Sequence, residues 1–193
     1  MDDESFLIVN NAEPGIEEFC IPLVDILQRE GCTSRILEYR QAPSADFGGC
    51  RGVFLSGSPR GDDIVEHHQP YFQWIRSVRI PVLGICAGHH IIGRLFQARL
   101  IRDREKEVGD YTVTVEVGDP LFQGMENPLT VRQDHHDSIT LPGGFVRLAR
   151  SGRCRVQAMR HRHRPIYSTQ FHPEVLNPQM IRNFVKITRR PVP

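Results

Sequence analysis

The sequence lacks the features that would direct it to a membrane or to nucleic acid. No apolar run approaches the length that spans a bilayer. The first residues, Met-Asp-Asp-Glu-Ser, are acidic and are not typical of a signal peptide. There is no excess of one charge either, because 24 lysines and arginines stand against 23 aspartates and glutamates. These absences predict a cytoplasmic protein with no nucleic-acid and no membrane partner.

Closely spaced cysteine pairs are also absent. The cysteines are Cys20, Cys32, Cys50, Cys86 and Cys154. An odd and scattered set favours reduced thiols over a disulfide framework or a zinc site. Several histidines stand in adjacent pairs, and neighbouring residues seldom converge on one metal ion. We therefore expect no metal site.

The pattern of apolar residues is typical of an α/β fold. Strands are predicted at 6–9, 35–39, 52–55 and 82–85, with helical spacing at 15–30 and 71–78 between them. This alternation predicts an open, mostly parallel sheet with helices on both faces. Alternating segments at 111–117, 145–149 and 156–159 predict additional antiparallel strands in the C-terminal half, and a last helix is expected at 178–188. A length of 193 residues suits one domain.

The most informative segment is 81–90, which reads Pro-Val-Leu-Gly-Ile-Cys-Ala-Gly-His-His. A buried strand leads into a helix, so Cys86 falls on the tight turn between them. A helix N-terminus favours the thiolate, which is the nucleophilic form of cysteine. Gly84 and Gly88 suit a turn where a side chain would collide or where positive φ is needed. Cys86 is therefore a candidate nucleophile.

A candidate base lies near the C-terminus. Residues 166–174 read Ile-Tyr-Ser-Thr-Gln-Phe-His-Pro-Glu, a short strand that leads to His172 with Glu174 two residues later. An imidazole can take the proton of a thiol, and a carboxylate can fix its tautomer and orientation. Either motif alone is more simply a buried cysteine or a surface histidine. Together, the two motifs favour a Cys-His-Glu triad.

The two motifs resemble the signature pair of the class I (triad-type) glutamine amidotransferases, and the resemblance runs from about residue 6 to residue 184. Residues 154–161 and 164–175 are most similar to the stand-alone amidotransferase subunits of GMP synthase. Residues 134–139 resemble the Ser-His-x-Asp-x-Val segment of those subunits. The resemblance implies a single glutamine amidotransferase domain over residues 1–193, with a flavodoxin-like sandwich fold.

The resemblance also implies a glutaminase reaction. Cys86 would attack the side-chain amide of L-glutamine and form a γ-glutamyl thioester, with His172 as base and acid and Glu174 orienting it. The developing oxyanion needs N–H donors. Ala87 directly follows the nucleophile and is one natural donor, and the resemblance implies the backbone N–H of Ser58 as the other. Gly57 and His90 complete the expected substrate-binding residues, and no cofactor is implied.

The sequence departs from the family pattern in three places. His90 stands where the family has a glutamine that helps to bind the substrate, and an imidazole cannot copy both ends of an amide. The loop 56–59 reads Ser-Gly-Ser-Pro instead of Ser-Gly-Gly-Pro, so Ser58 would be strained if positive φ were required. Residues 10–15 do not match the usual glycine-rich, Asp-containing segment.

Free ammonia is protonated in neutral water, so the resemblance implies a partner that consumes it, a separate ATP-dependent synthetase (ATP pyrophosphatase) chain. His135 and Asp137 are candidate interface residues, and a polar loop that caps a strand is the simpler interpretation. The interspersed charges of 102–107 predict a solvated loop. Two alternatives remain open. One is a stand-alone hydrolase of another γ-glutamyl compound, motivated by His90, and the other is a non-catalytic regulatory or binding protein on the same scaffold.

Overall fold

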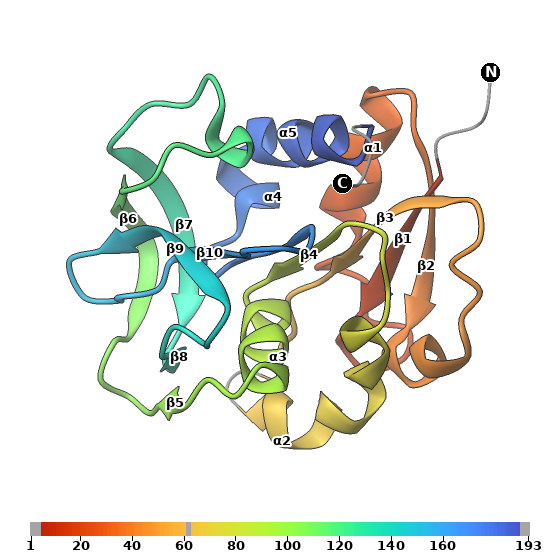
Figure 1. The fold of residues 1–193 in the computed structure, drawn as a ribbon, viewed down its shortest axis with the longest axis horizontal. Helices are drawn as coiled ribbons and strands as arrows, with labels where there is room; N and C mark the ends of the chain where they lie inside the picture. The colour runs from red at the N-terminus through yellow and green to blue at the C-terminus, as the bar shows by residue number, and fades with distance from the viewer. Residues whose placement is uncertain (1–4, 61–62, 190–193) are drawn as a thin grey trace.

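The computed structural model describes residues 5–60 and 63–189, and its centre is one nine-stranded mixed sheet (Figure 1). The strand order is β2-β1-β3-β4-β11-β10-β9-β6-β7. The first five strands in this order pair in parallel, and the others extend the sheet in antiparallel fashion. The predicted fold class is therefore confirmed, including the antiparallel strands in the C-terminal half.

The parallel half consists of β1 (Ser5–Asn10), β2 (Thr33–Glu38), β3 (Cys50–Leu55), β4 (Val82–Ile85) and β11 (Ile166–Thr169). The antiparallel half consists of β6 (Glu107–Val115), β7 (Leu129–His135), β9 (Phe145–Ser151) and β10 (Ala158–His161). A separate two-stranded antiparallel sheet pairs β5 (Leu100–Ile101) with β8 (Ser138–Ile139). Because β11 pairs with β4 on one side and β10 on the other, it joins the two halves.

Helices cover both faces of the sheet. The α-helices are α1 (Ile21–Arg29), α2 (Ile64–His68), α3 (Ala87–Leu95), α4 (Pro173–Leu176) and α5 (Pro178–Thr188). Short 3-10 helices span Tyr39–Ser44, Gln69–Arg76 and Pro120–Phe122. Figure 1 shows α1 and α5 together on one face and α2 and α3 on the other. Within the described residues no helix is both long and apolar enough to cross a membrane.

The core is divided by the sheet into one cluster on each face. Successive side chains of a strand point to opposite faces, so Phe6 and Ile8 pack under α1 and α5 while Leu7 and Val9 pack under α3. All four side chains are fully buried. Burial on both faces explains why the parallel strands appear in the sequence as continuous apolar runs.

Two expected helices differ from the prediction. The segment 15–30 forms α1 only from Ile21, because residues 13–20 make successive turns and Pro22 lies in the first turn of the helix. Residues 71–76 of the predicted helix 71–78 belong to a 3-10 helix that begins at Gln69, directly after α2, and ends at Arg76. Pro70 has no N–H, so it interrupts the α-helical hydrogen bonding at that point.

The prediction of a solvated loop at 102–107 is correct for residues 102–104 and 106, which are exposed, but wrong for two glutamates. Glu105 and Glu107 are buried, and Glu107 is the first residue of β6. The Glu105 carboxylate accepts from the Ser138 hydroxyl at 2.7 Å, and the Glu107 carboxylate accepts from the Ser151 hydroxyl at 2.6 Å. Hydrogen bonds from side chains distant in the sequence therefore compensate for the burial of both carboxylates.

Candidate active site

Cys86 occupies the turn between β4 and α3, as the sequence predicts. Its backbone has φ 49° and ψ −97°, a conformation that residues with a Cβ rarely adopt. The turn is held by hydrogen bonds on both sides. The Cys86 N–H donates to the Thr169 carbonyl at 2.8 Å, and the Cys86 carbonyl accepts from the His89 amide at 2.9 Å. The side chain is partly exposed at the carboxyl end of the parallel strands.

The two glycines that flank Cys86 provide space rather than positive φ. A Cβ on Gly84 would lie 2.6 Å from the Gly88 carbonyl oxygen. A Cβ on Gly88 would lie 2.8 Å from the carbonyl oxygen of Leu55 on β3. Neither glycine has a positive φ. Of the two reasons that the sequence left open, the avoidance of a collision is therefore the correct one.

His172 and Glu174 form a buried pair beside this turn. His172 lies after β11 and precedes the first residue of α4, while Glu174 lies in the first turn of α4. The His172 Nδ1 is 2.7 Å from the Glu174 Oε1, and the side chains are 5% and 1% exposed. A carboxylate accepts at this distance from a protonated Nδ1, which leaves Nε2 to face the cysteine.

The surroundings of His172 favour its charged form. Burial alone would lower the pKa of His172 and is the largest single effect. The charge and hydrogen bond of Cys86, followed by those of Glu174, outweigh it, so that the pKa lies well above its usual value. An imidazolium paired with a thiolate is the arrangement expected of an activated cysteine.

The loop after β3 packs directly against the imidazole. A Cβ on Gly57 would lie 2.9 Å from the Cε1 of His172 and 2.8 Å from the Cδ1 of Phe19. Glycine at this position therefore lets the loop approach the histidine. Ser58 does not have a positive φ, so replacing the second glycine of the family motif causes no strain of the kind considered above.

Asn11 is a site residue that the sequence did not reveal. Its side-chain amide donates to the Ser56 carbonyl at 2.7 Å, and its backbone N–H donates to the Ser56 hydroxyl at 3.0 Å. These bonds fasten the end of β1 to the loop that holds Gly57. The mismatch of 10–15 with the family pattern pointed to this segment, but its partner lies 45 residues away in the chain.

Two backbone amides are free to act as donors to an oxyanion. Within the described residues, neither the Ser58 N–H nor the Ala87 N–H has a hydrogen-bond acceptor. Ala87 is the first residue of α3, where an amide has no partner inside the helix. Free amides at a helix start favour negative charge.

One cavity of about 430 Å³ brings most of the predicted residues together. Its lining includes Cys86, Ala87, Ser58, His90 and His172. It also includes residues that the sequence did not single out, namely Glu18, Phe19, Pro59, Asp134 and His136. Cys86, His172 and the two residues with free amides, Ser58 and Ala87, therefore line one cavity, and such a set of groups suits acyl transfer.

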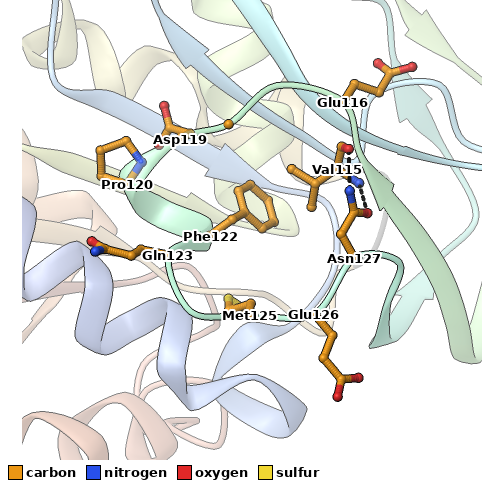
Figure 2. Close-up of a pocket in the computed structure, with 10 residues that line it drawn as sticks. Val115, Glu116, Asp119, Pro120, Phe122, Gln123, Met125, Glu126 and Asn127 are labelled. Atoms are coloured by element: carbon orange, nitrogen blue, oxygen red, sulfur yellow. Dashed lines mark hydrogen bonds between the residues drawn. The ribbon is translucent and has the colours of Figure 1, made fainter.

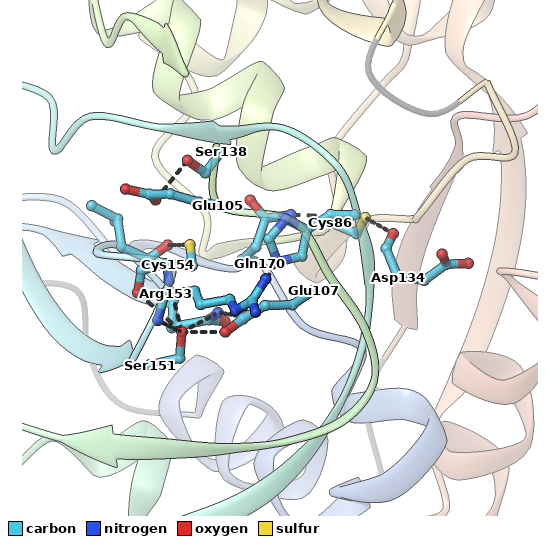
Figure 3. Close-up of polar contacts among 12 residues, drawn as sticks. Cys86, Glu105, Glu107, Asp134, Ser138, Ser151, Arg153, Cys154 and Gln170 are labelled. Carbon is cyan, nitrogen blue, oxygen red and sulfur yellow. Dashed lines mark hydrogen bonds and ion pairs between the residues drawn. The ribbon is translucent and has the colours of Figure 1, made fainter. Parts of the chain in front are cut away.

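His90 is held by Gln170 and is neutral. Its Nε2 lies 2.7 Å from the Gln170 Oε1, and because an amide oxygen can only accept, Nε2 carries the proton. Burial lowers the pKa of His90 to about 4, although the bond to Gln170 opposes this effect. The Gln170 Nε2 lies 4.0 Å from the Cys86 sulfur (Figure 3). His90 thus orients the Gln170 amide toward Cys86.

The candidate interface residues His135 and Asp137 are buried, with exposures of 4% and 1%. The His135 Nδ1 donates to the Asp137 carbonyl at 2.8 Å, and the Asp137 carboxylate accepts from Arg102 at 2.7 Å. His135 lines the cavity of Cys86 together with its exposed neighbours Asp134 and His136, whereas Asp137 is not part of that lining. The Asp134 carbonyl oxygen lies 3.8 Å from the Cys86 sulfur (Figure 3).

A second hollow lies away from this chemistry. It is formed by residues 115–127 around Phe122 and Met125, and it has a volume of about 650 Å³ (Figure 2). The Asn127 side chain bonds both backbone groups of Val115 at 2.9 Å and shapes its wall. None of the predicted site residues lines it. Among the described residues, no group of three or more His, Cys, Asp or Glu side chains is arranged to hold a metal ion.

Comparison with known proteins places this fold and site in a family. The family model described as glutamine amidotransferase class-I matches residues 19–187. The chain belongs to the class I glutamine amidotransferases, and the resemblance carried by the two sequence motifs is confirmed.

The most similar relatives include archaeal subunits of one enzyme. The A subunit of GMP synthase (glutamine-hydrolyzing) from Thermoplasma acidophilum is 34% identical over 168 residues, which cover 84% of each chain. Its counterpart from Pyrococcus furiosus is 33% identical over 148 residues, covering 71% of this chain and 75% of the relative. The chain is thus a class I glutamine amidotransferase that resembles the glutamine-hydrolyzing A subunits of GMP synthase.

Solved structures agree with this assignment. A crystal structure from Thermoplasma acidophilum, of a protein described as the A subunit of a GMP synthase, has a TM-score of 0.85. It is 30% identical in sequence and covers 96% of this chain and 94% of its own. A glutamine amidotransferase from Thermotoga maritima has a TM-score of 0.75 at 20% identity, covering 95% and 81%, and shows the same fold.

Proposed function

We propose that this chain is a glutaminase that hydrolyses the side-chain amide of L-glutamine through Cys86, His172 and Glu174. The observation that carries the proposal is the cavity lined by Cys86, His172, Ser58 and Ala87, in surroundings that raise the pKa of His172. Nothing in this mechanism requires a metal or an organic cofactor. We also propose that residues 1–193 act as a single amidotransferase domain.

In the first half of the reaction, the Cys86 thiolate attacks the amide carbon of glutamine. The carbonyl oxygen becomes an oxyanion, which accepts hydrogen bonds from the Ser58 and Ala87 amides. His172 gives its proton to the departing nitrogen, the C–N bond breaks, and ammonia leaves. The product on the enzyme is a γ-glutamyl thioester, and His172 is now neutral.

In the second half, His172 removes a proton from water, and the resulting nucleophile attacks the thioester carbon. The same two amides stabilise the second oxyanion. The C–S bond breaks, glutamate leaves, and the thiolate–imidazolium pair is restored. Glu174 remains ionised throughout and stabilises the imidazolium through its 2.7 Å hydrogen bond.

The ammonia would be delivered to a partner. Free ammonia is protonated in neutral water and then no longer acts as a nucleophile, so a glutaminase that serves synthesis needs an acceptor close by. By analogy with the GMP synthase subunits that it resembles, the partner is a separate ATP pyrophosphatase chain that aminates XMP. Interface roles for His135 and Asp137 remain part of this proposal, through the loop that they hold in place.

The test is release of glutamate from L-glutamine by the purified chain, alone and with the ATP pyrophosphatase chain encoded in the same genome. The wild type should release glutamate, and the partner should increase the rate. Cys86→Ala should lower the rate by at least about 1000-fold. No Cys86-dependent release in either condition would disprove the glutaminase.

A γ-glutamyl compound other than glutamine remains a second candidate substrate. The observation that favours it is the hydrogen bond between His90 and Gln170. His90 stands at the substrate-binding position of the family, and this bond uses its N–H, so the N–H is not available to glutamine. A series of γ-glutamyl amides and peptides in the same assay distinguishes the two. A higher kcat/KM for one of these compounds than for glutamine would favour the second candidate.

A further inference from the structure

A basic hollow lies beside the two-stranded sheet formed by β5 and β8. It has a volume of about 960 Å³ and opens to solvent. Six arginines line it, from the segment 99–104, from β9 and from the loop that follows β9. They are Arg99, Arg104, Arg147, Arg150, Arg153 and Arg155.

Most of this charge is not compensated. Arg147 and Arg150 share a single carboxylate, that of Glu116. No carboxylate from the described residues lies within 4.0 Å of the other four guanidinium groups. Six arginines against Glu105 and Glu116 give a local charge of +4, whereas the formal charge of the whole chain is +1. The near-neutral composition therefore conceals a basic surface.

The hollow also offers apolar surface. Leu141 in its lining is 41% exposed, and Leu100 and Ile101 of β5 are half-buried. The Glu105 carboxylate is turned inward, where it accepts from the Ser138 hydroxyl and from the Arg155 backbone amide at 3.1 Å. Guanidinium groups around partly apolar lining are typical of protein interfaces, where arginine is enriched.

One segment belongs both to this hollow and to the margin of the active site. Arg99 and Arg104 face the hollow, and between them Arg102 pairs with the Asp137 carboxylate at 2.7 Å. The backbone N–H of Asp103 donates to the same carboxylate at 2.9 Å. Asp137 directly follows residues 134–136, which line the cavity of Cys86.

We propose that the basic hollow is the docking surface for an acidic face of the protein that accepts the ammonia. The proposal rests on the proposed function. The charge selects an acidic partner, and the breadth of the surface favours a protein over a small anion, because the arginines come from three separate segments. Docking there would contact the segment 99–105 and, through Asp137, the loop beside Cys86, which gives the partner a physical route to stimulate turnover.

The test compares two double charge reversals. Arg153→Glu with Arg155→Glu alters the hollow. Arg51→Glu with Arg79→Glu is the matched control, because it changes the charge equally at exposed residues near the amino ends of β3 and β4, the ends opposite to the active site. The probe is the ATP pyrophosphatase chain from the same genome. Its Kd is measured by calorimetry at low and at moderate salt, and thermal unfolding verifies that each variant is folded.

The hollow variant should bind at least about 10-fold more weakly than the wild type and show a shallower salt dependence, because the reversed groups steer the encounter. The control should bind within about 3-fold of the wild type. Glutaminase activity without the partner should be the same in all three proteins, since none of these arginines contacts the cavity.

Equal affinity of both variants, or equal weakening in both, would overturn the proposal. Absence of any binding by an active wild type would overturn it too, while the glutaminase assignment would stand. Displacement of the partner by inorganic phosphate at constant ionic strength would reassign the hollow to a small anion. Loss of the Cys86-dependent glutaminase in every sample would instead count against the proposed function.

Discussion

At the scale of single residues, the site concentrates its backbone strain at Cys86. A φ of 49° with a ψ of −97° is unfavourable for any residue that carries a Cβ. Gly84 and Gly88 leave room for this turn, and the bond to the Thr169 carbonyl holds it in place. The strained backbone of Cys86 therefore reduces the free energy of unfolding of the protein.

Replacing Cys86 by glycine should give a more stable protein than replacing it by alanine. Glycine would relieve strain of about 1–3 kcal/mol and lose about 0.5–1 kcal/mol through its freedom in the unfolded chain, so we expect a difference of about 1 kcal/mol. Urea unfolding of the two variants measures it. Both variants lack the thiol and should be inactive. An alanine variant more stable than the glycine variant by about 0.5–1 kcal/mol would show that the turn is unstrained.

Replacing His90 by alanine should destabilise the fold by about 1–3 kcal/mol, because the buried Gln170 oxygen would lose its donor. His90→Gln can still donate to that oxygen and should cost less than His90→Ala. Urea unfolding of the two variants provides the comparison, and glutamate release shows whether the orientation of Gln170 matters for turnover. Equal stability of both variants would mean that the hydrogen bond contributes nothing.

At the scale of elements, the local spacing of apolar residues predicted helices and strands that depend on local interactions. The apolar run 82–85 was sufficient for β4, and α5 spans Pro178–Thr188 as predicted. The burial of Glu105 and Glu107 could not be predicted. Their partners Ser138, Ser151 and Gln157 lie 33, 44 and 50 residues away, so no local pattern records the contacts. The hydrogen bonds between Asn11 and Ser56 could not be predicted for the same reason.

The loop after β3 offers a test of close packing at the site. In Gly57→Ala, the new Cβ would lie 2.9 Å from the His172 ring, so the imidazole must move. We expect glutamate release to fall at least about 10-fold, with a loss of about 1–3 kcal/mol in stability. Gly118→Ala is the control, because nothing lies within 4 Å of its new Cβ. Unchanged turnover in Gly57→Ala would show that the loop does not position His172.

At the scale of the whole molecule, buried neutral histidines make the fold sensitive to acid. His68, His89 and His90 are buried, and burial lowers the pKa of each. For His68 and His90 the pKa falls to about 4. His172 acts in the opposite direction. Its raised pKa adds stability that is complete below the unfolded value of about 6.5 and is lost as the pH rises through the raised value.

The free energy of unfolding should therefore fall as the pH decreases from about 6.5 to about 4. In this range the histidines bind protons in the unfolded chain but stay neutral in the folded protein. His68→Gln removes one such group and should reduce the slope in this range by up to about 1.4 kcal/mol per pH unit. Urea unfolding at a series of pH values measures both slopes. An unchanged slope in the variant would show that His68 is not a source of the acid sensitivity.

The pairing of β4 with β11 has a consequence for how the enzyme loses activity. Cys86 and His172 follow neighbouring interior strands, on which Ile85 lies opposite Thr169, whereas β2 and β7 form the two edges of the sheet. Amides of such central strands exchange their hydrogens with solvent only when the whole structure opens, while the edges fray separately. The reacting groups should stay aligned for as long as the centre of the sheet is closed. Catalytic activity and the protection of the slowest-exchanging amides should then be lost at the same denaturant concentration. The rate of turnover would be proportional to the fraction of folded molecules.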